Sequence, residues 1–256
     1  MESAFIKRKS FGVQKSQWWP KKSKALPYDL NWKLGLCVPT RHSNIKQIQQ
    51  TALSGLNSTM LIFIPSSLLR ILPKTFAKSD IQYVIFSRNA QVVSFGSEAF
   101  SHSHKLKSLL IPNSVEILGD SCFECSKPQF IGLASGSKLR KIGQSAFSNS
   151  SISSIEIPSS MEELSYECFS DSKIKFIALP SNSKLKIIPY GAFSRCKRLS
   201  SLEIPPSVEE IHEFAFARSS LPSITFSPHS KLKEVYKGAF YSCSKLTSIE
   251  IPASVE

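Results

Sequence analysis

Apolar and polar residues alternate in short runs that recur along most of the 256-residue chain. In residues 246–252, apolar side chains at positions 249 and 251 alternate with polar ones at 248 and 250, and a proline follows. This period of two predicts a short strand with one buried face. A proline cannot donate to a strand ladder, so each such strand is expected to end there. The equivalent prolines are 46 or 47 residues apart, at Pro65, Pro112, Pro158, Pro205 and Pro252.

A second pattern, a small residue followed by Phe, recurs every 22 to 24 residues. Its phenylalanines are Phe76, Phe100, Phe123, Phe147, Phe169, Phe193, Phe216 and Phe240. Leu53 stands in the same phase one unit earlier, where the flanking sequence aligns without a gap. Units that lack the proline carry Ser-Lys-Leu instead, at residues 137–139, 183–185 and 230–232. The repeat is therefore a pair of alternating units.

A unit of this length cannot bury its own apolar face, so neighbouring units must stack into a solenoid. We predict an α/β repeat solenoid with a parallel β-sheet on one face and rungs about 4.8 Å apart. Apolar pairs three residues apart, such as Val208 and Ile211, predict irregular or short helical returns on the other face, with Phe filling the core. A strand within residues 34–39 is expected to open the array. The array then spans residues 34–256, with an incomplete last unit.

One unit spells Leu199-x-x-Leu202-x-Ile204-Pro205-x-Ser207-Val208-x-x-Ile211-x-x-x-Ala215-Phe216, and Cys196 follows Phe193 by three residues. This pattern resembles the BspA-like class of leucine-rich repeat, and the alternation with Ser-Lys-Leu units is similar to its protist surface-antigen members. The resemblance covers nearly the whole array. It implies a right-handed coil without enzyme activity that is associated with cell surfaces and adhesion.

Charge is concentrated at the start of the chain. The net charge is +13, and residues 1–50 contain ten Lys or Arg against two acidic residues, together with all three Trp. We treat residues 1–33 as a separate basic, Trp-rich leader. It is expected either to cover the first rung as a cap or to bind a polyanion. The residues for the second role are Lys7, Arg8, Lys9, Lys21, Lys22 and Lys24.

The alternation within each strand also indicates which side chains face outward. Along the array, these outward positions are apolar or aromatic in the N-terminal half and mostly Ser or Glu in the C-terminal half. Exposed apolar area of this kind often marks an interaction surface. We therefore predict a protein-binding site made by Leu61, Phe63, Tyr83, Ile85, Leu110, Phe130 and Phe176. The alternative is that the leader folds over the same residues.

Most cysteines, which could suggest a disulfide or a metal site, occur at fixed positions of the repeat. Five of the six cysteines do so, and equivalent ones are two rungs apart, about 9 to 10 Å, too far for a disulfide. They are expected to be small buried side chains rather than metal ligands. His102 and His104 fall in a turn that we expect to be exposed. With no nucleophile elbow or phosphate loop, we predict no enzyme activity, no cofactor and no metal.

The compartment is left open by the sequence. Residues 1–30 have no apolar stretch typical of a signal peptide, and no 18-residue apolar run predicts a membrane span. These features favour the cytoplasm, whereas the family resemblance favours the cell surface. The last unit stops before its Phe, so end-to-end association through that rung is a further expectation. The leading function is an adhesin-like protein-binding solenoid, and the alternatives are a polyanion-binding basic arm or an intracellular scaffold.

Overall fold

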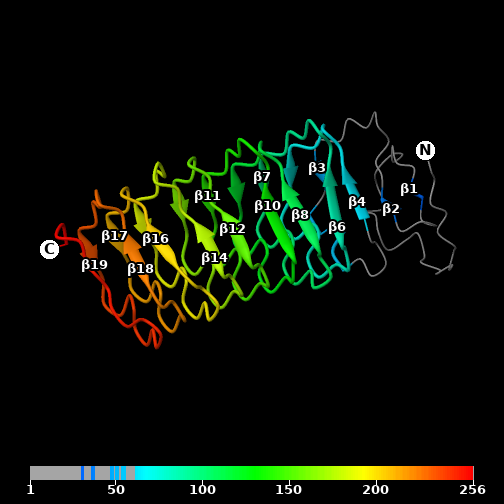
Figure 1. Ribbon diagram of the computed structural model, residues 1–256. Coiled ribbons are helices and arrows are strands. Elements are labelled where there is room, and N and C mark those ends of the chain that lie inside the picture. Colours follow the sequence, from blue (N-terminus) through cyan, green and yellow to red (C-terminus); the bar gives the residue numbers. More distant parts are fainter. Residues whose placement is uncertain are drawn as a thin grey trace, which may run out of the picture.

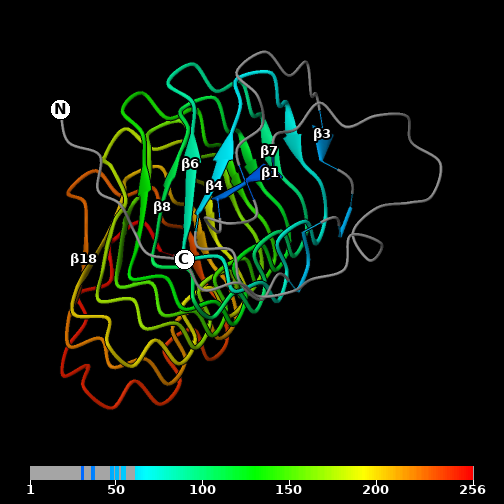
Figure 2. The ribbon, with the colours of Figure 1, turned by 90° about the vertical axis from the view of Figure 1, so that its right-hand side faces the viewer.

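The computed structural model describes residues 30–31, 36–37, 47–48, 50–51, 53–55 and 61–255. In this part the chain winds into an elongated coil in which each repeat unit makes one turn (Figure 1). Two sheets run along the coil, and Figure 2 shows its turns stacked behind one another, seen from the N-terminal end. Most of residues 1–33, including the six basic residues predicted to bind polyanions, lie outside the described residues.

The first sheet, here called the long-strand sheet, contains the strands with alternating residues. Its strands are β1 (Leu30–Asn31), β2 (Leu36–Cys37), β4 (Leu61–Ile64), β6 (Tyr83–Phe86), β8 (Ser108–Ile111), β10 (Phe130–Leu133), β12 (Ser154–Glu156), β14 (Phe176–Ala178), β16 (Leu202–Ile204) and β18 (Ile224–Phe226). Strand pairing runs in three blocks, β1 to β10, β12 with β14, and β16 with β18, and it is parallel except between β1 and β2. A single parallel bridge, from Phe176 to Ser201, links the last two blocks. The predicted parallel sheet is thus confirmed, and β2 lies within the strand expected at residues 34–39.

The second sheet, here called the short-strand sheet, was not predicted. Its two-residue strands also pair in parallel, except that Glu163–Leu164 and Ile187–Ile188 do not pair with each other. They are β3 (Gln47–Ile48), β5 (Arg70–Ile71), β7 (Ser94–Phe95), β9 (Ile117–Leu118), β11 (Lys141–Ile142), β13 (Glu163–Leu164), β15 (Ile187–Ile188), β17 (Glu210–Ile211) and β19 (Glu234–Val235).

The expectation of an α/β fold with helical returns is wrong, because the described residues contain no helix. Val208 and Ile211 are both buried, as a helix would have them. However, the backbone around them bonds to neighbouring turns: the Tyr236 N–H donates to the Ile211 carbonyl at 2.8 Å, and the Glu209 N–H to Lys186 at 2.7 Å. A turn followed by a two-residue strand buries the same two side chains as a helical turn would.

The third side of the coil is the turn that contains Phe, and it forms a hydrogen-bonded ladder without strand geometry. The Phe123 N–H donates to the carbonyl of Ala146 in the next unit at 2.7 Å, and the same bond recurs along the array. Residues two before and two after each Phe have positive φ, as at Glu98 (57°) and His102 (56°). Their N–H groups also donate to the next unit, at Asp120 and Glu124. Backbone bonds therefore connect most neighbouring turns on all three sides.

The predicted Phe core is confirmed. From Phe76 to Phe240, successive rings are stacked with centroids 4.9 to 5.5 Å apart and planes within 17° of parallel. All of these rings up to Phe216 are fully buried. Aromatic pairs at this separation contribute beyond the area that they bury, so the stack is a continuous core shared by all turns.

Three residues after each stacked Phe stands a Ser or Cys, and in several turns this side chain bonds to the backbone, whereas the buried hydroxyls of Ser79 and Ser150 have no partner. The Ser103 hydroxyl donates to the Phe76 carbonyl at 2.8 Å, and the Cys196 thiol donates to the Phe169 carbonyl at 3.1 Å. Cys196 and Ser103 therefore perform the same structural role in different turns. Repeat phase explains the cysteines, as predicted.

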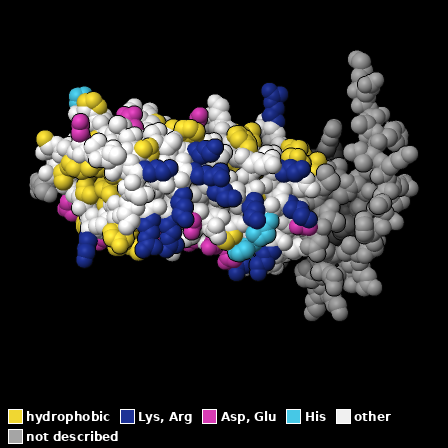
Figure 3. Space-filling model, turned by 60° about the horizontal axis from the view of Figure 1, so that its bottom comes forward, with side chains coloured by type: hydrophobic (Ala, Val, Ile, Leu, Met, Phe, Trp, Pro, Cys, Tyr) yellow, Lys and Arg dark blue, Asp and Glu magenta, His cyan; other side chains and the backbone are white. Residues whose placement is uncertain are grey.

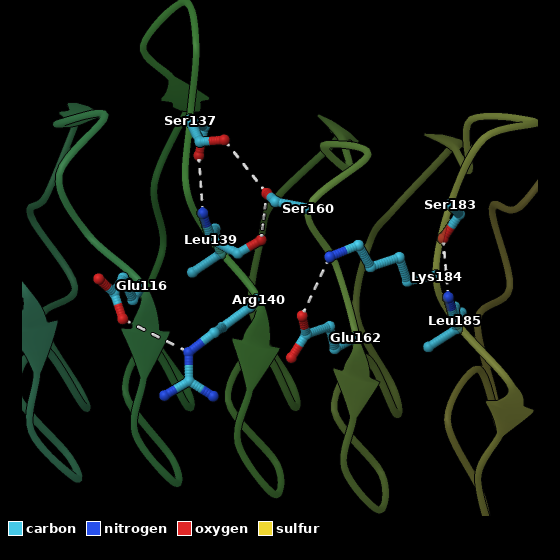
Figure 4. A network of polar contacts seen from close by, with 9 residues as sticks. All are labelled: Glu116, Ser137, Leu139, Arg140, Ser160, Glu162, Ser183, Lys184 and Leu185. Carbon is cyan, nitrogen blue, oxygen red and sulfur yellow. Dashed lines mark hydrogen bonds and ion pairs between the residues drawn. The ribbon is translucent and has the colours of Figure 1, made fainter.

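The two long edges of the coil differ in charge. The Phe-side edge is formed by the segments that begin at the second residue after each stacked Phe and end at the next long strand. The Pro-side edge is formed by the segments that join each long strand to the following short strand. Figure 3 shows dark blue Lys and Arg side chains along the face that is brought forward there. On the Pro-side edge, cations and carboxylates alternate from turn to turn, as in the pairs Arg140–Glu116 and Lys184–Glu162, each at 3.4 Å (Figure 4).

On the Pro-side edge, a Ser-Lys-Leu turn and the Pro-type turn after it are joined by hydrogen bonds (Figure 4). The Ser137 hydroxyl accepts the Leu139 N–H at 3.3 Å, which shapes the Ser-Lys-Leu turn. In the next unit, the Ser160 hydroxyl donates to the carbonyls of Ser137 and Leu139 at 3.1 and 2.8 Å. The Pro158 turn thus closes the backbone of the Ser-Lys-Leu turn before it, whereas the equivalent Ser207 hydroxyl of the Pro205 turn is buried without a partner.

Candidate functional site

The predicted binding residues all lie on the outer face of the long-strand sheet, and we call the seven together the sheet-face strip. Between them along the strands lie buried residues such as Ile62, Val84 and Leu109. Four of the seven are well exposed, namely Ile85 (48%), Leu110 (55%), Phe130 (54%) and Phe176 (59%). Leu61, Phe63 and Tyr83 are half-buried.

Strand register brings six of the seven together. Leu61 pairs with Tyr83 and Phe63 with Ile85, so these four form a block across β4 and β6. The same register places Leu110 of β8 beside Ile85, and Leu110 pairs with Gly132 of β10. Phe176 is separate, because it lies two strands beyond Phe130 and Ser154 of β12 lies between them.

Gly132 is a member of this surface that sequence reasoning did not single out. A Cβ at this position would lie 2.5 Å from the Cζ atom of Phe130 and 3.3 Å from Cδ1 of Leu110. The Phe130 ring therefore lies across Gly132, toward Leu110. An aromatic ring that covers a strand glycine in this way protects the backbone, and here it also makes the apolar surface continuous.

A shallow groove of about 450 Å³ lies beside this block, at the carboxyl ends of β6, β8 and β10. Its apolar wall includes Ile85, Phe86 and Leu110, while Arg88 and Asn113 supply polar groups. The groove depends on the loop after β6, which has no proline turn. The sequence pattern could therefore locate the outward residues but not the groove beside them.

The histidines and cysteines, which are the other candidates for metal binding or catalysis, do not form a common site in the described residues. His102 and His104 are exposed, as predicted, with their rings 6.0 Å apart. Over the described ranges, no group of three His, Cys, Asp or Glu residues could hold a metal ion. Cys122, Cys168 and Cys196 are buried free thiols, and burial raises the pKa of each, that of Cys196 to about 12. Such thiols are poor nucleophiles.

The arrangement of stacked parallel turns with an exposed sheet face defines the class of this protein as a solenoid repeat protein. The family profile described as the BspA type leucine rich repeat region matches residues 46–175 and 167–256, in six copies. The chain belongs to this family, and the resemblance noted from the sequence is confirmed.

Solved structures of other proteins share the fold. The crystal structure of the pneumococcal vaccine antigen PcpA is similar with a TM-score of 0.58 at 23% sequence identity, over 83% of this chain and 57% of that chain. This chain therefore spans little more than half of that protein. A leucine-rich repeat protein from Eubacterium ventriosum matches with a TM-score of 0.42 at 18% identity, over 83% of this chain and 72% of the other. A comparison with curated proteins matched none.

Proposed function

We propose that this chain is a non-enzymatic binding protein, adhesin-like or surface-antigen-like, that holds a protein partner on the sheet-face strip. The observation that supports this most directly is the contiguous apolar block at Ile85, Leu110 and Phe130, with a groove beside it. Large apolar side chains on paired strands, here β4 to β10, are suited to anchor a partner, because little conformational entropy is lost when they bind.

The surface role is supported by resemblance. A protein of the same fold is described as a pneumococcal vaccine antigen, and the repeat family includes surface proteins. Within the described residues no helix is both long and apolar enough to cross a membrane. We place this chain among exposed binding proteins, and protease added to intact producing cells tests this: loss of the protein supports exposure, and protection contradicts it.

The absence of enzyme activity is also part of the proposal. A catalytic cysteine needs a lowered pKa and access to substrate, whereas Cys122 and Cys168 are buried with raised pKa values. Two pockets of the described region, one beside Ile85 and one beside Gly191, are lined by residues without a nucleophile and base in hydrogen-bond contact. This favours binding over catalysis.

Cell binding by two matched variants tests the role of the sheet-face strip. One variant carries Ile85→Ser, Leu110→Ser and Phe130→Ser, and the other carries Glu203→Ser, Thr225→Ser and Glu250→Ser, at exposed positions in the C-terminal half of the array. We expect the first to lose binding to intact cells and the second to retain it, with protease treatment of the target cells abolishing binding. Retention by the first variant, or binding that survives such treatment, contradicts the proposal.

An alternative is that residues 1–33 cover the sheet-face strip within the same molecule. The fluorescence of a dye that binds exposed apolar surface distinguishes the two. If the sheet-face strip is open, the full chain binds dye and the Ile85→Ser, Leu110→Ser, Phe130→Ser variant binds less. If the leader covers it, dye binds there only after residues 1–33 are deleted.

A further inference from the structure

The Phe-side edge carries a concentration of positive charge that the sheet-face strip does not use. Between residues 61 and 255 there are 22 Lys and Arg and 16 Asp and Glu. Half of these cations and two of the carboxylates, Asp80 and Asp171, lie on the Phe-side edge. Its cations are Lys78, Lys105, Lys107, Lys127, Lys173, Lys175, Arg195, Lys197, Arg198, Arg218 and Lys245, and all of them are exposed.

Fewer of these cations form ion pairs with carboxylates than do the cations on the rest of the described surface. Six of the other eleven cations of residues 61–255 form ion pairs with carboxylates. Glu209, for example, bonds to both Lys186 and Lys233, at 2.5 and 2.8 Å. On the Phe-side edge, Lys105 forms the one such pair among the described residues, with Asp80 at 2.7 Å.

Stacking of the turns arranges the cations of the Phe-side edge in a row along the coil. Equivalent positions in successive turns are about 4.8 Å apart, so the edge from Lys78 to Lys245 extends over roughly 35 Å. Figure 3 shows the dark blue side chains spread along the length of the coil. Charges in a row much longer than the Debye length of about 8 Å attract a long anionic chain better than a single small anion.

The side chains beside the row are mainly hydroxyls. Exposed serines border it at the start of the long strands and in the loops before them, at Ser153, Ser154, Ser201, Ser223, Ser244 and Ser248. Aromatic rings along the same border, at Tyr83, Phe130 and Phe176, are two turns apart. Lys107 lies over the Tyr83 ring, with its Nζ 5.6 Å from the centroid. Sparse rings and many hydroxyls suit a polyhydroxylated chain better than a row of stacked bases.

From these observations we propose that the Phe-side edge binds a linear acidic polysaccharide, one that carries sulfate or carboxylate groups, along the axis of the coil. Lys and Arg pair with the anionic groups, and the bordering serines bond to sugar hydroxyls. At one end, Arg195 and Arg218 flank a hollow of about 240 Å³ between Glu167 and Phe214, above Gly191. Tyr190 and Tyr241 also line it, which provides room for one sugar ring against aromatic walls. The cations of this site lie outside the sheet-face strip, which the site borders at Tyr83, Phe130 and Phe176.

The test uses the full chain with Lys7, Arg8, Lys9, Lys21, Lys22 and Lys24 changed to Gln, so that the leader does not contribute cations. The probes are heparin, an unsulfated polyuronate and a single-stranded DNA oligonucleotide, and the dissociation constant is measured from low to physiological salt. An edge variant adds Lys173→Gln, Lys175→Gln and Lys197→Gln. A control with the same net charge adds Lys138→Gln, Lys184→Gln and Lys231→Gln on the Pro-side edge.

We expect the edge variant to bind at least one of the two glycans about tenfold more weakly than the control does, with a smaller dependence on salt. Binding of heparin alone indicates that the natural ligand is a sulfated polysaccharide. Binding of the polyuronate as well indicates that a carboxylated polysaccharide suffices. The proposal is overturned if both variants weaken equally, if binding disappears once the leader is neutralised, or if the DNA binds more tightly than either glycan through the same residues.

Discussion

At the scale of single residues, repeat phase decides what each side chain does. Phe147 and Phe176 are the same residue type, yet the first is fully buried in the ring stack and the second is 59% exposed. Both placements could be predicted from the sequence, because a side chain in a fixed phase has the same neighbours in every turn. The contact between Phe130 and Gly132 could not, since it depends on how one ring lies across the sheet.

Truncation of one ring in the stack should therefore be far more damaging than truncation of an exposed one. Phe147 stacks on Phe123 and Phe169, with centroids 5.2 Å away on both sides. We expect Phe147→Ala to destabilise the fold by about 3–5 kcal/mol, because a cavity opens between two rings. Phe176→Ala is the matched control and should change stability by less than about 0.5 kcal/mol. Urea unfolding measures both, and equal effects would contradict the role of the stack.

Cysteine reactivity provides a second prediction at this scale. Burial raises the pKa of the Cys196 thiol to about 12 and also raises those of Cys122 and Cys168. Alkylation requires the thiolate, so these three should stay unmodified in the native protein at pH 8. Cys125 and Cys243 are half-buried and should react first. Peptide mass spectrometry after alkylation, with a denatured control, locates the modified sites.

At the scale of elements, the unpredicted feature is the short-strand sheet. A local pattern such as Val208 and Ile211 is compatible with one turn of helix and equally with a turn before a strand. What distinguishes them is where the backbone bonds go, and the partners lie 22 to 25 residues away, in the neighbouring turns. The secondary-structure propensity of one unit therefore cannot reveal a hydrogen-bond partner in a neighbouring unit, because the two come together only after the units stack.

The ion pairs between turns on the Pro-side edge lead to a pH prediction. Hydrogen bonds from Lys186 and Lys233 lower the pKa of Glu209 from 4.5 to about 2. A carboxylate with a lowered pKa stabilises the fold above its ordinary pKa, and this contribution is lost as the pH falls toward the folded value. The difference in unfolding midpoint between the natural chain and Glu209→Gln should therefore be constant above pH 5 and decrease from about pH 4.5 to about pH 2. Because the group is exposed, salt should reduce the difference, and a difference that grows at low pH would contradict the assignment.

At the scale of the whole molecule, the coil is a one-dimensional object in which each turn contacts only its neighbours. The central turns have a neighbour on both sides, with amides such as that of Phe123 bonded to the next turn. Cys243 and Leu246 are half-buried, whereas the equivalent Cys196 and Leu199, two turns earlier, are fully buried.

Hydrogen exchange should reflect this gradient. We expect the amides of Phe123, Phe147 and Phe169 to exchange slowest and those of Cys243 and Leu246 to exchange faster, because the turn around Cys243 is less buried than the central turns. Exchange measured by mass spectrometry or NMR checks this. Uniform protection along the chain would show that the turns unfold as one unit.

The sequence by itself determined the solenoid, the long strands, the buried Phe and Cys positions and the outward apolar residues. It could do so because these depend on phase within a unit, and phase is the same wherever a unit lies. The tertiary structure alone decided the second sheet, the groove beside Ile85, the ring of Phe130 over Gly132 and the row of cations on the Phe-side edge. Each of these arises between turns, where residues about 23 positions apart become neighbours only after the coil has closed.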